Sequence, residues 1–323
     1  MEFRTVIKPL SLQGFFDHRS RIMTLGSCFA DEISSFLKRD GFNIFSNPFG
    51  TLYNPLSISE ALSRIIDKRY FSEKDVVCRK ENGENIYCCL GTSSICNSLS
   101  ASGCVELANK ALEKAHAFLK DADILTITLG TARCFIYKDT DAPVANCHKL
   151  PSANFEVRQL SVNDVVSSLS ASVNRLKEFN PGIKVLMTVS PNRYLSYGFH
   201  ESQMDKSVLI LSTGDLCSIK DVTYFPAYEA VVDDLRDYRF YADDMIHPSH
   251  QAVEYVYSLL CDSFFTPETK SISKECASIT RMRNHRTLND SQKGTHNINI
   301  ENKEKELLVR YDFLSHFIDG NSI

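Results

Sequence analysis

Three short and almost entirely apolar stretches constrain the fold of this 323-residue chain more than any other feature. They span residues 22–26, 123–130 and 184–189, and the last two are rich in β-branched side chains. Strands that are apolar on both faces are typical of parallel sheets, whose two faces are covered by helices. Segments with helical spacing of apolar residues alternate with these stretches. We therefore predict an α/β fold, doubly wound or three-layered, with a mainly parallel sheet.

The remaining elements follow from the same patterns. Further strands are expected over residues 42–45 and 222–225. Helices are expected over residues 31–39, 57–66, 105–119, 162–179, 202–213, 229–235 and 249–265, the second of them capped by Ser57. Beyond Thr266 the chain becomes polar and has one weak apolar period. We expect one α/β domain over residues 1–266 and a polar, partly helical C-terminal extension over residues 267–323.

Composition argues against several classes of partner. The net charge is −4 and the basic residues are dispersed, so neither a nucleic acid nor a membrane surface is expected to bind. We find no signal peptide and no apolar run long enough to span a bilayer. The 11 cysteines are odd in number and none forms a C-x-x-C pair, which indicates reduced thiols and a cytoplasmic location.

Candidate functional residues gather at the predicted strand ends. Ser27 and Cys28 follow the first apolar stretch, Gly130 and Thr131 follow the second, and Ser190 follows the third. Ligands of parallel sheets bind beyond the carboxyl ends of the strands. These residues are therefore expected to line one site.

Ser27 and Cys28 are the two candidate nucleophiles. A serine needs a base and an oxyanion hole to act as a nucleophile. A cysteine at a helix N-terminus is activated by the helix itself, because the positive helix end stabilises the thiolate and lowers the pKa of the thiol. The negative charges of Asp31 and Glu32 would offset part of this lowering of the thiol pKa. The structural alternative is a helix cap at Ser27 beside a small core residue at Cys28.

Asp244 and His247 form the candidate acid–base pair. An aspartate three residues before a histidine can orient the imidazole from the same loop and leave the other ring nitrogen free as a base. Asp243 and His250 compete for these roles, and a purely structural loop histidine is the alternative. These four residues are the only cluster of potential metal ligands that we find in the sequence, and we expect no metal there.

Six segments of the chain resemble the successive motifs of the GSCFA family. They are LGSCFA (25–30), NPFGTLYNP (47–55), TLGT (128–131), NCHK (146–149), TVSP (188–191) and YRFYADDMIHPS (238–249). This family of bacterial proteins is grouped with the SGNH/GDSL hydrolase superfamily, and the resemblance runs from about residue 2 to residue 265. It implies a flavodoxin-like, three-layer α/β/α fold and ester or acyl-transfer chemistry.

The resemblance also implies roles for individual residues. Asp244 and His247 match the last block of the superfamily, and Gly50 matches the loop glycine whose N–H helps to bind the oxyanion. The block after the central strand normally supplies an asparagine, but Ala132 stands there in this chain. Asn146 and Asn54 are the replacements that we consider, with Asn146 preferred because it lies downstream of the same strand.

The nucleophile of the superfamily usually stands two residues after a glycine. Counting from Gly26 places Cys28 there, and we favour it. Ser27 remains the alternative if the turn is one residue tighter. Thr131, His148 and Arg193 are further candidates for contacts with substrate, although structural roles would also explain the last two.

These observations predict a hydrolase or acyltransferase that acts on an acyl ester of a small molecule or glycan through a Ser/Cys–His–Asp arrangement. A non-catalytic small-molecule or carbohydrate-binding protein on the same fold is one alternative. An O-acetyltransferase of cell-surface glycan precursors that uses acetyl-CoA is another, although the sequence carries no recognisable CoA signature. No cofactor is otherwise expected, and the oligomeric state is left open.

Overall fold

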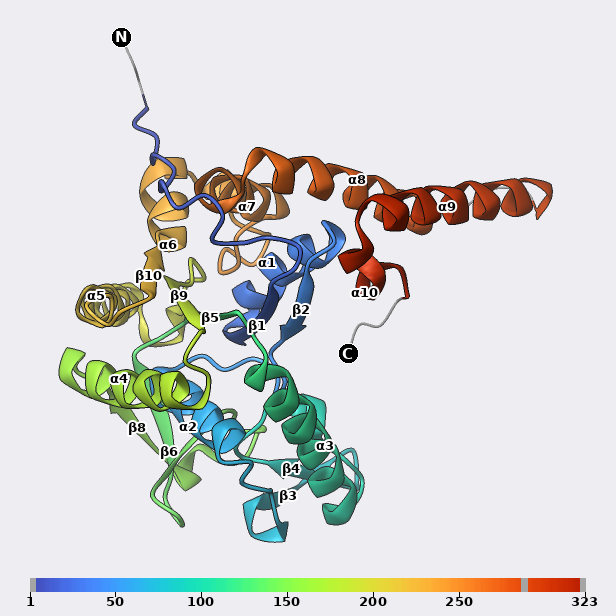
Figure 1. Cartoon of the computed structure of the whole chain (residues 1–323). Coiled ribbons are helices and arrows are strands. Elements are labelled where there is room, and N and C mark those ends of the chain that lie inside the picture. Colours follow the sequence, from blue (N-terminus) through green and yellow to red (C-terminus); the bar gives the residue numbers. More distant parts are fainter. Residues whose placement is uncertain (1–3, 286–289, 320–323) are drawn as a thin grey trace.

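A five-stranded parallel sheet organises the computed structural model, which describes residues 4–285 and 290–319 (Figure 1). The strands lie in the order β10-β9-β5-β1-β2, and every neighbouring pair is parallel. Their bounds are β1 Arg21–Gly26, β2 Asn43–Ser46, β5 Ile124–Leu129, β9 Lys184–Val189 and β10 Val222–Phe225. Counted along the chain within this sheet, the order is the flavodoxin-like 2-1-3-4-5. The predicted α/β fold with a mainly parallel sheet is confirmed.

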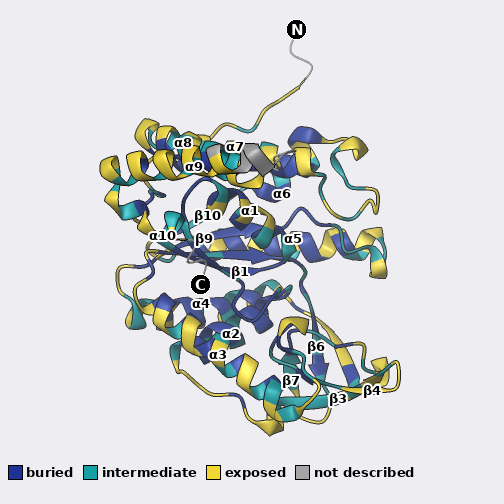
Figure 2. Cartoon of the chain, turned by 90° about the vertical axis from the view of Figure 1, so that its right-hand side faces the viewer, coloured by how far each residue is buried: buried dark blue, intermediate teal, exposed yellow. Residues whose placement is uncertain are grey.

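Helices cover both faces of the sheet and complete three layers (Figure 2). One face carries α1 Cys28–Arg39, α6 Ala227–Glu229, which continues as a wider turn over Ala230–Leu235, and α7 His250–Phe264. The other face carries α2 Pro55–Ile66, α3 Ala101–Lys120, α4 Val162–Phe179 and α5 Phe199–Leu216. Because both faces are covered, the central strands are buried along nearly their whole length.

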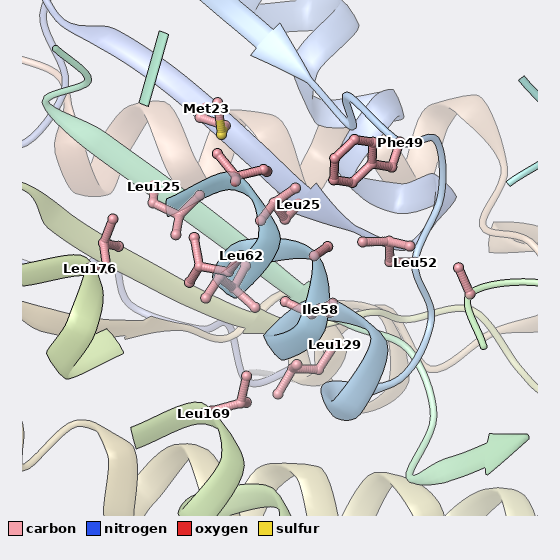
Figure 3. Close-up of a cluster of buried hydrophobic side chains, with 14 of the residues drawn as sticks. Met23, Leu25, Phe49, Leu52, Ile58, Leu62, Leu125, Leu129, Leu169 and Leu176 are labelled. Carbon is pink, nitrogen blue, oxygen red and sulfur yellow. The ribbon is translucent and has the colours of Figure 1, made fainter. Parts of the chain in front are cut away.

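The side chains of each strand alternate between two cores. In β1, Ile22 packs with α1 and α7, whereas Met23 and Leu25 point to the opposite layer. Figure 3 shows Met23 and Leu25 in that second core, near Leu62 of α2. This alternation explains why the strands read as continuous apolar runs in the sequence.

Two small antiparallel sheets lie outside the central one. β3 Val76–Glu81 and β4 Glu84–Cys89 form a hairpin, whose turn contains Gly83 with a φ of 87°. β6 Arg133–Tyr137 pairs with β7 Ala142–Val144 on one side and β8 Phe155–Gln159 on the other. The second sheet follows directly after β5, so its first residues reach the carboxyl end of the central sheet.

The C-terminal segment is helical and packs on the α/β core. It comprises α8 Pro267–Asn284, α9 Asp290–Arg310 and α10 Ser315–Ile318. Thr280 Oγ1 donates a hydrogen bond to the carbonyl of Arg39 at 2.9 Å, and His316 Nε2 lies 3.1 Å from the carbonyl of Gly41. Arg39 and Gly41 precede β2, so the segment contacts the edge of the sheet opposite the carboxyl ends of the strands.

Candidate active site

The turn from β1 into α1 is held tightly against β5. Gly26 has a φ of +149°, and a Cβ at this position would lie 2.3 Å from the carbonyl oxygen of Thr128. Its N–H donates to Oδ1 of Asn47 at 2.9 Å, which anchors the 47–55 loop to the end of β1. A glycine is needed here because any larger residue would push β1 away from β5. Ser27 and Cys28 therefore emerge between β1 and β5, where the strand order reverses and ligands of such sheets bind.

Ser27 and Cys28 differ sharply in accessibility. Ser27 is 0% exposed, and its hydroxyl has no hydrogen-bond partner among the described residues. It precedes α1, yet its side chain makes no capping hydrogen bond. Cys28 is the first residue of α1 and is partly exposed. Of the two predicted nucleophiles, only the thiol is open to a substrate in this structure.

Asn192 contacts the thiol directly. Its Nδ2 lies 2.9 Å from Sγ of Cys28, although the two residues are 164 positions apart in the sequence. Asn192 is buried and follows the end of β9, and its N–H donates to Oγ of Ser190 at 3.2 Å. Sequence reasoning missed Asn192. Its position two residues after Ser190, at a predicted strand end, was the available signal.

The environment of Cys28 favours the neutral thiol. Burial raises the pKa of Cys28, and the charge of Asp31 raises it further. The hydrogen bond from Asn192 and the backbone N–H groups of Cys28 and Phe29 lower it, but they do not outweigh burial. The N–H groups of the helix terminus thus act in the predicted direction, but the net shift of the pKa of Cys28 is upward. Cys28 needs a base before it can act as a nucleophile at neutral pH.

Asp244 and His247 lie together in the loop before α7. Nδ1 of His247 is 2.7 Å from Oδ2 of Asp244, while Oδ1 of Asp244 accepts the N–H groups of Ile246 at 2.9 Å and His247 at 3.0 Å. The side-chain bond to His247, followed by these two backbone bonds, lowers the pKa of Asp244 to about 2. The carboxylate is thus charged across the physiological range and fixes the imidazole through Nδ1, which leaves Nε2 available.

Arg193 joins this loop to the loop that carries Asn192. The N–H of Arg193 donates to the carbonyl of Ile246 at 3.0 Å, and its Nη1 donates to the carbonyl of Met245 at 3.0 Å. Its guanidinium also lies over the rings of Phe199 and Tyr241, each at 5.3 Å. In the loop after β9, Asn192 therefore contacts Cys28, and the next residue, Arg193, binds the loop that carries Asp244 and His247.

The competing residues of the same loop take other positions. His250 is the first residue of α7, and its ring packs on Phe36 of α1 at 5.5 Å. Asp243 is exposed. Among residues 4–285 and 290–319, no three His, Cys, Asp or Glu side chains are grouped so that they could hold a metal ion.

Of the residues expected to form the oxyanion hole, Gly50 and Asn54 donate their hydrogen bonds elsewhere, and Asn146 is engaged through its oxygen. The N–H of Gly50 donates to the carbonyl of Asn47 at 2.7 Å. Asn54 caps α2, since its Oδ1 accepts the N–H of Ser57 and its Nδ2 donates to the hydroxyl of Ser57, both at 2.9 Å. Oδ1 of Asn146 accepts the N–H of His148 at 2.7 Å. In this conformation the side chain beside Cys28 is Asn192.

His148 and Thr131 serve mainly internal contacts. His148 is buried, and its Nε2 lies 3.0 Å from the carbonyls of both Cys89 and Thr92. Burial lowers the pKa of His148. Thr131 donates its hydroxyl to Oδ2 of Asp205 at 2.6 Å. His148 thus supports a neighbouring loop, and Thr131 faces α5.

Lys206 lies beneath the site and was also missed by sequence reasoning. It is 2% exposed, and its Nζ donates to the carbonyls of Gly130 at 2.6 Å and Ser190 at 2.7 Å. Burial lowers the pKa of Lys206 to about 7, although the charges of Asp205 and Cys28 oppose this shift. Lys206 therefore ties together the ends of β5 and β9, which flank the site.

Two cavities, each of about 240 Å³, lie near the 192–197 segment. The first, which we call the Arg193 cavity, is lined among others by Asn192, Arg193, Gln203, Lys206, Arg236 and Tyr238. The second, which we call the Tyr197 cavity, is lined among others by Tyr53, Phe135, Val144, Ala145, Tyr194 and Tyr197. The segment contributes residues to both cavities and so separates them.

Comparisons with known proteins place the chain in a family. Residues 21–259 match the model of the GSCFA family. The comparison with curated proteins found no match. No helix of the described part combines the length and apolar character needed to cross a membrane.

Among solved structures, the chain is similar to three esterases. A carbohydrate esterase family 3 structure from Talaromyces cellulolyticus has 9% identity and a TM-score of 0.35, with 79% of this chain and 99% of that chain covered. A family 3 carbohydrate esterase from Clostridium thermocellum has 11% identity and a TM-score of 0.37, with coverage of 80% and 98%. An acetyl xylan esterase from Butyrivibrio proteoclasticus has 10% identity and a TM-score of 0.37, with coverage of 75% and 63%. The assignment of the fold rests on the strand order and not on these similarities.

Proposed function

Because this chain belongs to the GSCFA family, in which ester and acyl-transfer chemistry is expected, we propose that it is a thiol-dependent esterase or acyltransferase with Cys28 as its nucleophile. One observation carries the proposal. Asn192 Nδ2 lies 2.9 Å from Sγ of Cys28, and the next residue, Arg193, holds the loop of the Asp244–His247 pair. A nucleophile, a hydrogen-bond donor and an oriented base are thus linked through one short segment.

The steps assign a role to each group. His247 Nε2 takes the proton of Cys28, and Sγ forms a bond to the acyl carbonyl carbon. The negative charge on the carbonyl oxygen is stabilised by the backbone N–H of Cys28, which is free at the first turn of α1, and by Nδ2 of Asn192. His247 then gives its proton to the leaving alcohol, and a thioester remains on Cys28. Asp244 stabilises the imidazolium throughout.

The thioester is resolved by water or by another acceptor. His247 removes a proton from the incoming hydroxyl, whose oxygen attacks the thioester carbon, and Cys28 leaves as a thiolate that regains the proton. Water gives a free acid, whereas a second alcohol gives a new ester. The proposed substrate is an acyl ester of a small molecule or glycan.

Residue-specific labelling tests this proposal. The intact protein and its His247→Ala variant are treated separately with a fluorophosphonate and with limiting iodoacetamide, and the modified peptides are mapped. We expect alkylation of Cys28 that slows about 10²-fold or more without His247, because the neutral thiol then lacks its base. Cys78, which is exposed, is the internal control and should react equally in both proteins.

Each alternative result has a definite meaning. Phosphonylation of Ser27 that depends on His247 would replace the proposed thiol mechanism by a serine hydrolase. Equal alkylation of Cys28 with and without His247 would remove His247 as the base.

A non-catalytic binding protein is the second candidate function. It is favoured by the raised pKa of Cys28 and by the N–H of Gly50, which is occupied by Asn47. In that case no activated ester would acylate the protein, and the Cys28→Ala variant would bind ligands as the wild type does.

A further inference from the structure

We propose that the Tyr197 cavity receives the acyl chain of the substrate and that the Arg193 cavity receives its polar alcohol portion. This inference rests on the proposed function and deepens it, since it assigns the two halves of the ester to two different places. It predicts a substrate whose acyl group is longer than acetyl and whose alcohol is polar.

The position of Cys28 supports this division. Asn192, whose amide contacts Cys28 Sγ, lines the Arg193 cavity. Tyr53 and Tyr194 line the Tyr197 cavity, and their rings lie 6.0 Å apart. Both residues meet Gly130 at the end of β5: the carbonyl of Tyr53 accepts the N–H of Gly130 at 2.9 Å, and a Cβ on Gly130 would lie 2.5 Å from the hydroxyl of Tyr194. The same strand end holds the turn of Ser27 and Cys28, since the carbonyl of Thr128 accepts the N–H of Ser27 at 3.1 Å. Residues that line each of the two cavities thus border the end of the sheet at which Cys28 lies.

Several polar groups of the Tyr197 cavity are already engaged within the protein, whereas the buried hydroxyl of Tyr194 has no hydrogen-bond partner among the described residues. Thr131 donates to Asp205, Asn146 accepts from His148, and Asn54 is bonded to Ser57. A buried polar group that already has a partner gains little from a ligand.

What the Tyr197 cavity offers a ligand is therefore mainly apolar surface. The guanidinium of Arg133 lies flat on the ring of Tyr197, 4.6 Å from its centre, and is paired with Asp205. Phe135, Val144 and Ala145 supply further apolar lining. A neutral hydrocarbon chain suits such a surface, because it removes apolar area from water without leaving polar groups unpaired.

The Arg193 cavity has the opposite character. Arg193 and Arg236 bring positive charge to its wall, with Asp237 as a negative neighbour. Two aromatic side chains of this cavity are widely exposed, Phe199 at 66% and Tyr238 at 65%. Charged groups and exposed ring faces suit a polar alcohol that keeps contact with water at the mouth of the cavity.

Two matched substitutions test the assignment. Ser196 lies at the wall of the Tyr197 cavity and Gln203 at the wall of the Arg193 cavity, and both side chains are exposed. Ser196→Trp and Gln203→Trp therefore place the same bulky ring in one cavity each. Gln203→Trp also removes the acceptor of a 3.0 Å hydrogen bond from the hydroxyl of Tyr228, so urea unfolding of both variants accompanies the assay. The assay measures the rate constant for acylation of Cys28 by 4-nitrophenyl acetate, butyrate and hexanoate, followed by intact mass.

We expect the rate constant of the wild type to rise about fourfold for each methylene that enters the Tyr197 cavity. Ser196→Trp should abolish this rise, so that its rate constants for acetate, butyrate and hexanoate are similar, and Gln203→Trp should keep the rise. A wild type without chain-length dependence would overturn the inference. A rise that is lost in Gln203→Trp and kept in Ser196→Trp would also overturn it, because the acyl chain would then lie in the other cavity.

A binding measurement separates this inference from the proposed function. Hexanamide, a neutral acyl probe, is titrated into Cys28→Ala and into the Cys28→Ala/Ser196→Trp double variant by ligand-observed NMR. If no ester acylates Cys28 but only the double variant loses binding, the cavity assignment stands and the proposed chemistry fails. If Cys28 is acylated without chain-length dependence, the chemistry stands and the assignment fails. If the protein is neither acylated nor able to bind the amide, both fail.

Discussion

Lys206 should make the stability of this protein rise with pH in the alkaline range. Its ammonium is buried beneath the candidate site and donates hydrogen bonds to the neutral carbonyls of Gly130 and Ser190. Burial lowers its pKa from 10.5 to about 7. Between these values the unfolded chain binds one more proton than the folded protein, so raising the pH favours the folded state. Below about pH 7 both states are protonated and this contribution is constant.

The size of the effect follows from the linkage relation. One pH unit changes the free energy of unfolding by about 1.4 kcal/mol when one proton separates the two states. Between pH 7.5 and pH 9.5 the wild type should therefore gain about 2.7 kcal/mol relative to Lys206→Met. The variant also leaves two carbonyls without a donor, which costs about 1–3 kcal/mol each, but that cost does not depend on pH. The buried ammonium is therefore detected by how the difference in free energy of unfolding between the two proteins changes with pH, and not by the size of that difference at one pH.

Urea unfolding of the wild type and Lys206→Met at half-unit steps from pH 6.5 to pH 9.5 provides the measurement. Other titrating groups, including the buried thiols, are common to both proteins and cancel in the difference. Lys220→Met removes one positive charge from an exposed position and controls for the change in net charge. Parallel stability curves for the wild type and Lys206→Met would refute the reasoning, since they would show that Lys206 keeps its proton when buried.

Two further predictions concern the loops around the site. Asn192→Ala removes a hydrogen bond that lowers the pKa of Cys28, so the midpoint of the pH profile of Cys28 alkylation should move upward; acylation by an activated ester should slow about 10²-fold. An unchanged profile would argue against the contact. Gly50→Ala should lose about 2–5 kcal/mol, because φ is +75° and a Cβ would lie 1.8 Å from Oγ of Ser93. Gly83→Ala is the matched control, because Gly83 has a φ of +87° and no atom near its Cβ position. Urea unfolding should show a loss of only about 1–2 kcal/mol for Gly83→Ala. Equal losses for the two variants would show that the clash with Ser93 does not contribute.

Much of the fold was predictable because burial on both faces leaves a direct trace in the sequence. The strands over 124–129 and 184–189 are apolar in four of six positions each, with threonine in most of the others, and the structure places both inside the sheet and not at its edges. The start of α2 was harder to predict. The pattern indicated a cap at Ser57, whereas Asn54 caps the helix and Pro55 begins it. Because the helix begins before Ser57, the side chain of Asn54 is hydrogen-bonded to Ser57 and is not available to a substrate.

The pairing of Asp244 with His247 could be read from the sequence, because the two residues are three positions apart and their contact is set by one turn of the chain. Contacts between distant segments could not. Asn192 reaches Cys28 across 164 residues, and Lys206 reaches the ends of two strands from α5. The only local signal is the position of Asn192 just after a predicted strand end, and no local pattern distinguishes Lys206 from other lysines.

The sequence by itself therefore determined the layers, the strands and the local acid–base pair, since periodicity and short-range spacing govern all three. The tertiary structure decided which of the two candidate nucleophiles is accessible, which asparagine lies beside it and in which direction the pKa of Cys28 shifts. The physical reason is that burial acts through the sum of all neighbours in space. For Cys28 that sum outweighs the field of its own helix, which is the only part of its environment that the nearby sequence encodes.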